Sequence, residues 1–456
     1  MRAPVFLRSL EERPSTHRGT RRERAPQHHP SDSQPRRRHP ASARPRWPGL
    51  LALLAASAAS AGEPARKITL ADALALAVLH NPDFRSTGYD VIAAQGAVVQ
   101  ASVLPNPGIE VSSYGRQVKP LAGPVPSQFG VNFTVPIGGK ISAATAAAEA
   151  TLDATKSTRE AARRQLVFSV QSAFVTLQLN QLLLTFALQD QAGFHKELDL
   201  NELRYKDGKI AFGELLKLRI QAVSTDDEVR EAREQVESAR ADLRHVVGEG
   251  VLADDFELVG ELLVPAAPGM KALDELLARA LDKRPDYLSL LAQEKSAEAA
   301  LRLARRTPIP DLGVLLDYNR PQAGGTPPSY DLVLSVPIPL FDHNQGNITS
   351  SEAALEKSKL AEESLRTQIR SDLWKGLQEW EAASGLLAAY QGGVVDEAKE
   401  SLEITRHAYE LGTGTLLDFL DAEASYRQVE SAYRASLART VIAAQNIQFI
   451  TGEAQP

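Results

Sequence analysis

The sequence contains no cysteine among its 456 residues. This absence excludes disulfides, thiolate metal sites, cysteine nucleophiles and a lipid-modified N-terminal cysteine. No run of eighteen consecutive apolar residues occurs either, so we expect no transmembrane helix. The common enzyme motifs are also missing, since we find no G-x-S-x-G, no H-E-x-x-H, no P-loop and no G-x-G-x-x-G between a strand and a helix. We therefore expect no catalytic activity and no cofactor.

Proline is absent from residues 137–264 and 340–455, which permits very long helices. Residues 142–206 would form a helix of about 100 Å at about 1.5 Å per residue. In three segments, the positions that would face a partner helix recur with an average spacing near 3.5 residues, which is typical of a coiled coil. We call such a row of positions a seam. These positions are Val170, Phe174, Leu177, Gln181, Leu184 and Leu188; Val229, Ala232, Val236, Ala239, Leu243 and Val246; and Ile369, Leu373, Leu377, Trp380, Ser384 and Leu387. The seams alone predict only an antiparallel coiled coil that packs on itself.

The net charge of −6 is divided unevenly along the chain. Residues 1–61 have a net charge of +8, which leaves −14 for residues 62–456. This basic segment is followed by a short apolar run, residues 50–56, and by Ala59-Ser60-Ala61, a pattern typical of a secretory signal. We expect residues 1–61 to be a disordered leader with a signal peptide. Its arginine clusters could also indicate nucleic-acid binding, but a segment destined for removal gives that reading little support, and we expect no nucleic-acid partner.

An internal repeat dominates the remainder of the chain. Four landmarks recur in order at offsets of about 201–204 residues, which chance rarely produces. They are Asn81-Pro82-Asp83-Phe84 and Arg284-Pro285-Asp286-Tyr287, Pro105-Asn106-Pro107 and Pro308-Ile309-Pro310, Val135-Pro136-Ile137 and Val336-Pro337-Ile338, and Tyr205-x-x-Gly208 and Tyr409-x-x-Gly412. We expect two copies of one unit, residues 62–250 and 271–456, joined by a linker at residues 251–270.

Each copy predicts the same order of elements. An Ala- and Leu-rich helix comes first, at about residues 69–103 in one copy and 273–306 in the other. Two strands follow in each copy, with apolar residues at every second position. The second strand of each pair is at residues 128–135 in one copy and 329–336 in the other, and a long loop rich in proline and glycine joins the two strands of each pair. The strands of each pair would form a β-hairpin, and the long coiled-coil helices would come next. The fold class is therefore mostly α, with four strands per chain.

Strands with one apolar face do not fit an ordinary soluble protein, because a lone hairpin is marginally stable in water. Four strands are too few to close a barrel, but strands of this length suit an outer-membrane barrel built from several chains. A trimer would supply twelve strands, and the long helices would continue as a tube across an aqueous compartment. We expect a protein that lies in the outer membrane, contacts lipid through its strands and extends far into the periplasm.

At this point the sequence resembles the TolC family of outer-membrane efflux proteins. The resemblance covers residues 68–452 and rests on the repeat and on Tyr409-x-x-Gly412-Thr413-x-Thr415-Leu416-Leu417-Asp418-x-Leu420-Asp421-Ala422. The run Val336-Pro337-Ile338-Pro339-Leu340-Phe341-Asp342 with Asn344-Gln345-Gly346-Asn347 is similar to the branch that serves cobalt–zinc–cadmium efflux. The resemblance implies a homotrimer, with a twelve-stranded barrel on an α-helical tunnel. It also implies a periplasmic adaptor (membrane fusion protein) and an inner-membrane pump of the RND type as partners.

Asp418 and Asp421 are three residues apart at the start of a helix and share one face. Acidic residues favourable to a first helical turn explain this pattern equally well. The resemblance implies that they form a carboxylate ring at the periplasmic mouth, attracting cations. It also implies that Tyr409 and Glu214 form a latch between neighbouring coiled coils, in which Gly414 replaces the arginine of drug-type relatives.

Gly208 and Gly412 would serve the turns between helices, where a positive φ is required. The resemblance adds that residues 205–216 and 409–421, including Tyr205 and Gly414, dock the adaptor, although turn geometry alone explains the glycines. Asp342 would be a helix N-cap. We expect no metal site, because no histidine pair has the spacing of a metal-binding helix. The alternatives are an outer-membrane channel for drug efflux or type I secretion and, in another class, a periplasmic coiled-coil scaffold.

Overall fold

The structure, a computed structural model, describes residues 66–112, 128–253, 256–260, 262, 264, 273–321 and 327–453. The chain divides into two units, Met1–Ala61 and Gly62–Pro456, and all described residues belong to the second. The predicted leader, much of the predicted linker and most of both hairpin loops lie outside the described residues.

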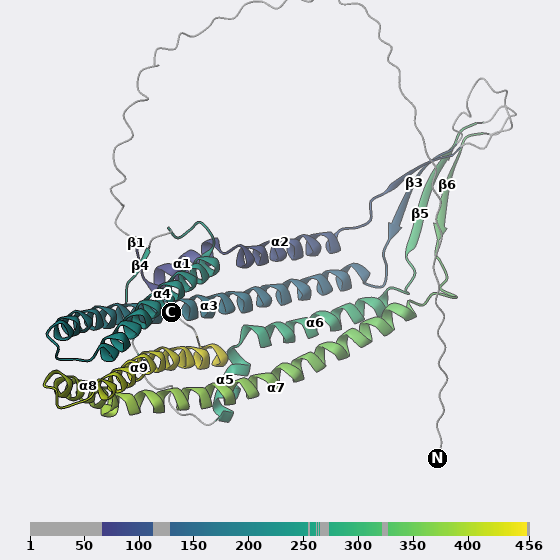
Figure 1. Cartoon of the computed structure of the whole chain (residues 1–456). Coiled ribbons are helices and arrows are strands. Elements are labelled where there is room, and N and C mark those ends of the chain that lie inside the picture. Colours follow the sequence, from purple (N-terminus) through teal and green to yellow (C-terminus); the bar gives the residue numbers. More distant parts are fainter. Residues whose placement is uncertain are drawn as a thin grey trace, which may run out of the picture. The chain divides into compact units, whose positions relative to one another are not determined.

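The second unit repeats one series of elements (Figure 1). The first series is α1 (Leu70–His80), α2 (Pro82–Ser102), β2 (Gly108–Ser112), β3 (Gln128–Val135), α3 (Lys140–Lys206) and α4 (Phe212–Val247). The second series is α5 (Leu273–Lys283), α6 (Pro285–Arg306), β5 (Leu312–Asn319), β6 (Ser329–Ser335), α7 (Gln345–Ala389), α8 (Val395–Glu410) and α9 (Leu416–Thr451). The strands lie at one end of the long helices and the turns of both helical hairpins lie at the other (Figure 1).

The four predicted strands form one antiparallel sheet in the order β2-β3-β5-β6. Cross-strand partners share a face, so the register divides the side chains into two sets. One face is apolar and consists of Ile109, Val111, Phe129, Val131, Phe133, Val135, Leu312, Val314, Leu316, Tyr318, Tyr330, Leu332 and Leu334. The other face is mostly polar. Strands β2 and β6 are the two edges of this sheet.

Each first helix predicted from the sequence is in fact two helices, so that prediction was wrong. Pro82 is the first residue of α2 and Pro285 is the first residue of α6. Proline is tolerated at this position because its missing N–H would have no partner in the first turn. Asn81 caps α2, since its side chain accepts a hydrogen bond from the Phe84 N–H at 2.8 Å. The proline therefore starts a new helix where the apolar pattern predicted a continuous one.

The long helix that follows the strands of the second copy is also interrupted. A π-helical turn, formed by residues Tyr390–Val394, divides it into α7 and α8. Gly393 has φ of 124° there, a conformation that residues with a Cβ rarely adopt. The absence of proline therefore did not guarantee an unbroken helix. The corner between β6 and α7 also differs from the prediction. Asn344, with φ of 60°, is the N-cap of α7, and Asp342 instead accepts a hydrogen bond from the Asn344 N–H at 2.8 Å.

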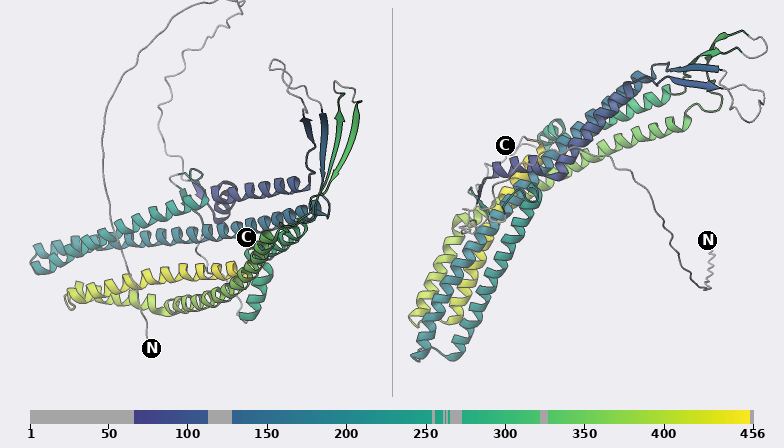
Figure 2. Two further views of the ribbon diagram at one scale, coloured as in Figure 1. Left: turned by 90° about the vertical axis from the view of Figure 1, so that its right-hand side faces the viewer. Right: turned by 90° about the horizontal axis from the view of Figure 1, so that it is seen from above.

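The predicted seams form the interior of the helical part. Val170, Leu177, Leu243, Ile369 and Leu373 are all completely buried. One apolar cluster joins α1, α3 and α4, a second joins α5, α7 and α9, and a third joins both hairpins near their turns. The two hairpins run alongside each other toward these turns (Figure 2). The seam residues therefore pack within each repeat, and other apolar side chains, such as Phe194, Leu402 and Phe419, hold the two hairpins together.

Two three-residue strands, β1 (Arg66–Ile68) and β4 (Phe256–Leu258), pair in parallel and were not predicted. They lie on the cluster of α1, α3 and α4, where Ile68 and Phe256 are buried. Among the described residues, only α3 is long and apolar enough to cross a membrane. The core helix of a soluble protein can have the same length and composition, and apolar residues of α3 pack against α4 and α9.

Candidate gate at the turns of the helical hairpins

The turns that end the two helical hairpins have the same backbone design. Gly208 has φ of 73° and Gly412 has φ of 74°, the left-handed conformation for which a glycine was predicted. After each glycine, the next N–H donates to a carbonyl five residues earlier, Lys209 to Arg204 at 2.8 Å and Thr413 to Ala408 at 2.9 Å. These bonds satisfy carbonyls that a helix end leaves without partners.

Asp418 and Asp421 both lie exposed in the first two turns of α9. Asp418 forms a capping box with Thr415: its Oδ2 accepts from the Thr415 hydroxyl at 2.6 Å, and its N–H donates to Thr415 Oγ1 at 3.2 Å. The helix-start explanation therefore applies to Asp418. It does not apply to Asp421, which lies three residues further along on the same face. Two exposed carboxylates thus stand side by side close to the hairpin turn.

Tyr409 is the centre of the contact between the two hairpins. Its ring is 5% exposed and stacks on Phe419 with 5.7 Å between the ring centroids. Its hydroxyl donates a hydrogen bond of 2.9 Å to Oδ1 of the fully buried Asn201 on α3. Arg204 places its guanidinium 5.2 Å from the ring centroid and donates to the Glu410 carbonyl at 2.9 Å. The last turns of α3 and α8 are thus tied together by one aromatic side chain.

The predicted partner of Tyr409 is Glu214, and in this chain the hydroxyl bonds Asn201 instead. Burial raises the pKa of Tyr409, and the negative charge of Glu214 raises it further. Glu214 lies in the first turn of α4 and affects the tyrosine by charge. A bond between Tyr409 and Glu214 of a neighbouring copy stays a prediction.

The structure gives a local reason for glycine at position 414. A Cβ added to Gly414 would lie 3.0 Å from the Ala408 Cβ and 3.2 Å from the Tyr409 nitrogen. Its N–H also donates to the Ala408 carbonyl at 2.9 Å. A side chain here would press on the last turn of α8, beside Tyr409. Tyr205, the other predicted docking residue, packs on Phe212 across the first turn, with 5.7 Å between ring centroids.

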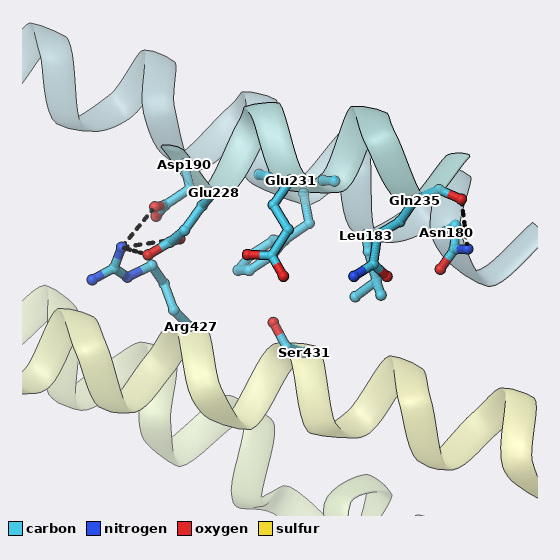
Figure 3. Close-up of a pocket in the computed structure, with 11 residues that line it drawn as sticks. Asn180, Leu183, Asp190, Glu228, Glu231, Gln235, Arg427 and Ser431 are labelled. Carbon is cyan, nitrogen blue, oxygen red and sulfur yellow. Dashed lines mark hydrogen bonds and ion pairs between the residues drawn. The ribbon is translucent and has the colours of Figure 1, made fainter. Parts of the chain in front are cut away.

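A buried charged cluster, which the sequence analysis missed, lies further along α9. Arg427 contacts Glu228 of α4 at 3.0 Å and Asp190 of α3 at 3.7 Å (Figure 3). Glu423, one turn before Arg427, is 4% exposed, and its Oε2 has no hydrogen-bond partner among the described residues. Burial, and then the negative charge of Asp190, raise the pKa of Glu423 to about 7. This cluster connects both hairpins through ionisable groups.

The spacing of α9 contained a signal for this cluster. Leu416, Phe419, Glu423, Tyr426 and Glu430 follow each other at intervals of three and four. Two acids therefore occupy seam positions, which normally carry apolar side chains. An acid at such a position predicts a partner inside the bundle. Arg434, one turn later, is the partner of Glu430 at 2.6 Å.

A cavity of about 310 Å³ lies beside the charged cluster, between α3, α4 and α9 (Figure 3). Its apolar wall includes Leu183 and Phe186, and its polar wall includes Glu231 and Ser431. Within the described parts of the chain, no group of three or more histidine, aspartate or glutamate side chains is arranged to hold a metal ion.

Comparison with known proteins gives a consistent result. A family profile described as outer membrane efflux protein matches residues 73–249 and 276–453. The cobalt-zinc-cadmium resistance protein CzcC of Cupriavidus metallidurans is 25% identical over 392 residues, which are 86% of this chain and 91% of the relative. The outer membrane protein TolC of Vibrio cholerae is 24% identical over 58% of this chain and 62% of its own length. The crystal structure of CusC superposes with a TM-score of 0.72 at 17% identity, covering 87% of this chain and 96% of CusC.

Proposed function

The chain belongs to the outer membrane efflux protein family, and on this basis we propose that it is the exit channel of a tripartite efflux system for heavy-metal cations. The similarity to the cobalt-zinc-cadmium resistance protein, which covers 86% of this chain, carries this proposal. The fold agrees with it, because an outer-membrane channel of this family combines membrane strands with a periplasmic helical tunnel. The channel would be a passive duct, with energy and metal selection supplied by an inner-membrane pump.

The sheet supports assembly into a homotrimer. Strands β2 and β6 leave their outer edges without partners among the described residues, and four strands cannot enclose a pore. Three copies would join β6 of one chain to β2 of the next and close a wall of twelve strands. The apolar face would then contact outer-membrane lipid and the polar face would line the pore.

The hairpin turns would form the periplasmic entrance. Asp418 and Asp421 of three chains would form a ring of six carboxylates that attracts cations. Tyr409 and Glu214 would help to hold this entrance closed. Residues 205–216 and 409–421 would dock the periplasmic adaptor, which connects the channel to an RND-type pump. Exposed apolar side chains near these turns, such as Phe212 and Leu411, suit a protein partner.

Deletion of the gene is expected to make cells more sensitive to zinc, cobalt or cadmium, because the efflux path would lose its exit. Growth of the deletion strain across concentration series of these metals, copper and several drugs measures this directly. Complementation with the intact gene is the control. Increased sensitivity to drugs alone would contradict the heavy-metal proposal and favour a drug-efflux channel, and recovery of the protein in soluble periplasm would favour the coiled-coil scaffold.

A further inference from the structure

The ionisable side chains of the sheet have an unusual distribution. Among the residues of β2, β3, β5 and β6, tyrosines apart, only Glu110, Asp317 and Asp331 can carry charge, and all three are acidic. All three belong to the mostly polar face. The sheet therefore has no basic side chain to compensate them, and Arg320, which follows β5, is exposed.

The three acids lie in a single row across the sheet. Glu110 pairs with Gly130, Gly130 pairs with Asp317, and Asp317 pairs with Asp331. The row crosses all four strands and contains three carboxylates and one glycine. We call these four residues the acidic row. It lies toward the ends of the strands that the hairpin loops connect, with β5 ending at Asn319 and β6 beginning at Ser329.

Gly130 gives the row its geometry. A Cβ added at Gly130 would collide with Oδ1 of Asp317, so this oxygen occupies the space that a side chain would fill. The Asp317 carboxylate therefore leans across β3 toward the strand of Glu110. Glu110 pairs with the same glycine from the other side, on β2.

Asp317 is 5% exposed, and its two oxygens have different surroundings. Oδ2 accepts a hydrogen bond of 2.7 Å from the Gln128 side chain, whereas Oδ1 is buried without a partner among the described residues. A buried carboxylate oxygen without a donor is costly and calls for a compensating positive group or water. Neighbouring carboxylates in the row increase that cost, since like charges repel.

We propose that the acidic row is a cation-attracting band in the exit half of the pore, separate from Asp418 and Asp421 at the entrance. The inference rests on the proposed function, because the polar face lines a pore only when copies of the sheet close. Three chains would place nine carboxylates around the exit. Cations would pass this band hydrated and weakly held, which suits release to the exterior.

The experiment compares the full-length wild-type trimer with the Glu110→Gln/Asp331→Asn variant in planar lipid bilayers, under a potassium chloride gradient. Both side chains are exposed, so we expect the variant to fold. The reversal potential should show at least about a threefold fall in the ratio of potassium to chloride permeability. Block by lanthanum added on the loop side should weaken, while block from the hairpin side persists. Glu110→Asp/Asp331→Glu, which keeps the charge, is the matched control and should behave as wild type.

Unchanged selectivity and unchanged loop-side block in a conducting variant would overturn the inference. Asp317→Asn, which keeps the shape of the buried side chain, provides a second variant and should shift the reversal potential in the same direction. Absence of any conductance from the wild-type trimer would contradict the proposed function itself, and the inference with it. The two failures are thus distinguished by the wild-type recording.

Discussion

Replacing Asp418 and Asp421 together with asparagine is expected to lower the cation selectivity of the reconstituted channel strongly. Two exposed carboxylates per chain share one face of α9 close to the hairpin turn. Three chains would bring six negative charges around one axis, and each contributes about 1 kcal/mol to a nearby cation even in water. Their loss should reduce the ratio of potassium to chloride permeability by about fivefold or more. The reversal potential under a salt gradient measures it.

Asparagine is the right replacement because Asp418 also caps α9. An asparagine keeps one oxygen that can accept from the Thr415 hydroxyl, so the helix start is largely preserved. Asp207→Asn is the matched control, since Asp207 is an exposed acid at the other hairpin turn, beside Lys209. An Asp418→Asn/Asp421→Asn channel with the selectivity of wild type would show that these residues only start the helix.

Replacing Arg427 with methionine is expected to destabilise the packing of the two hairpins by about 3–5 kcal/mol. Its guanidinium lies between Asp190 and Glu228, and both the Arg427 and Asp190 side chains are 13% exposed. Removing the cation leaves buried carboxylates uncompensated, and Glu423 lies one turn away on α9. Urea unfolding of the helical part, followed by circular dichroism, measures the loss. Arg219→Met is the control, because the exposed Arg219–Glu202 pair should contribute at most about 1 kcal/mol.

The cost of losing Arg427 should depend on pH. Glu423 has a pKa of about 7 in the folded protein, above its ordinary value of 4.5, so the folded state binds more protons between these two pH values. The contribution of Glu423 to stability is therefore fully present below pH 4.5 and is lost as the pH rises toward 7. At pH 5 Glu423 is already neutral, and the Arg427→Met variant should lose less stability than at pH 8. An equal loss at both pH values would show that Glu423 does not take part in the cluster.

The strands were predictable because their information is local. The period of two predicted a strand at Gln128–Val135, and β3 has these same bounds. In the structure, the apolar residues of β3 pair with apolar residues of β5 in the second copy. The seams were predictable for a similar reason, as the completely buried Val170 and Leu373 show. Toward the hairpin turn the seam loosens, since Leu188 is 37% exposed.

The errors arose where a residue has two compatible roles. Proline ends a helix in its interior and begins one at the first position, and the sequence alone did not separate these roles for Pro82 and Pro285. Gly393 adopted a conformation that breaks the helix, whereas Gly376 lies within α7 without interrupting it. Composition does not distinguish these two glycines.

The candidate site was only partly accessible to sequence reasoning. The turn glycines have a local signature, and their positive φ was predicted correctly. Asp418 and Asp421 also follow from local spacing, and their part in a gate stays a prediction. The cluster of Asp190, Glu228 and Arg427 joins three helices, whose side chains meet only after both hairpins pack. The acidic row was missed because register, which decides which residues lie opposite each other, depends on pairing between the two repeats.

The central claim is that three copies close a wall of twelve strands by joining β6 of one chain to β2 of the next. The natural absence of cysteine allows a clean test with one cysteine introduced on each edge, at Ile109 or Val111 and at Tyr330, Leu332 or Leu334. Within one chain these edges are three strand spacings apart, about 14 Å, too far for a disulfide. Oxidation of outer membranes from double variants should give covalent trimers on non-reducing gels, while single variants give none. Only monomers, or dimers alone, from folded protein in the outer membrane would contradict the account.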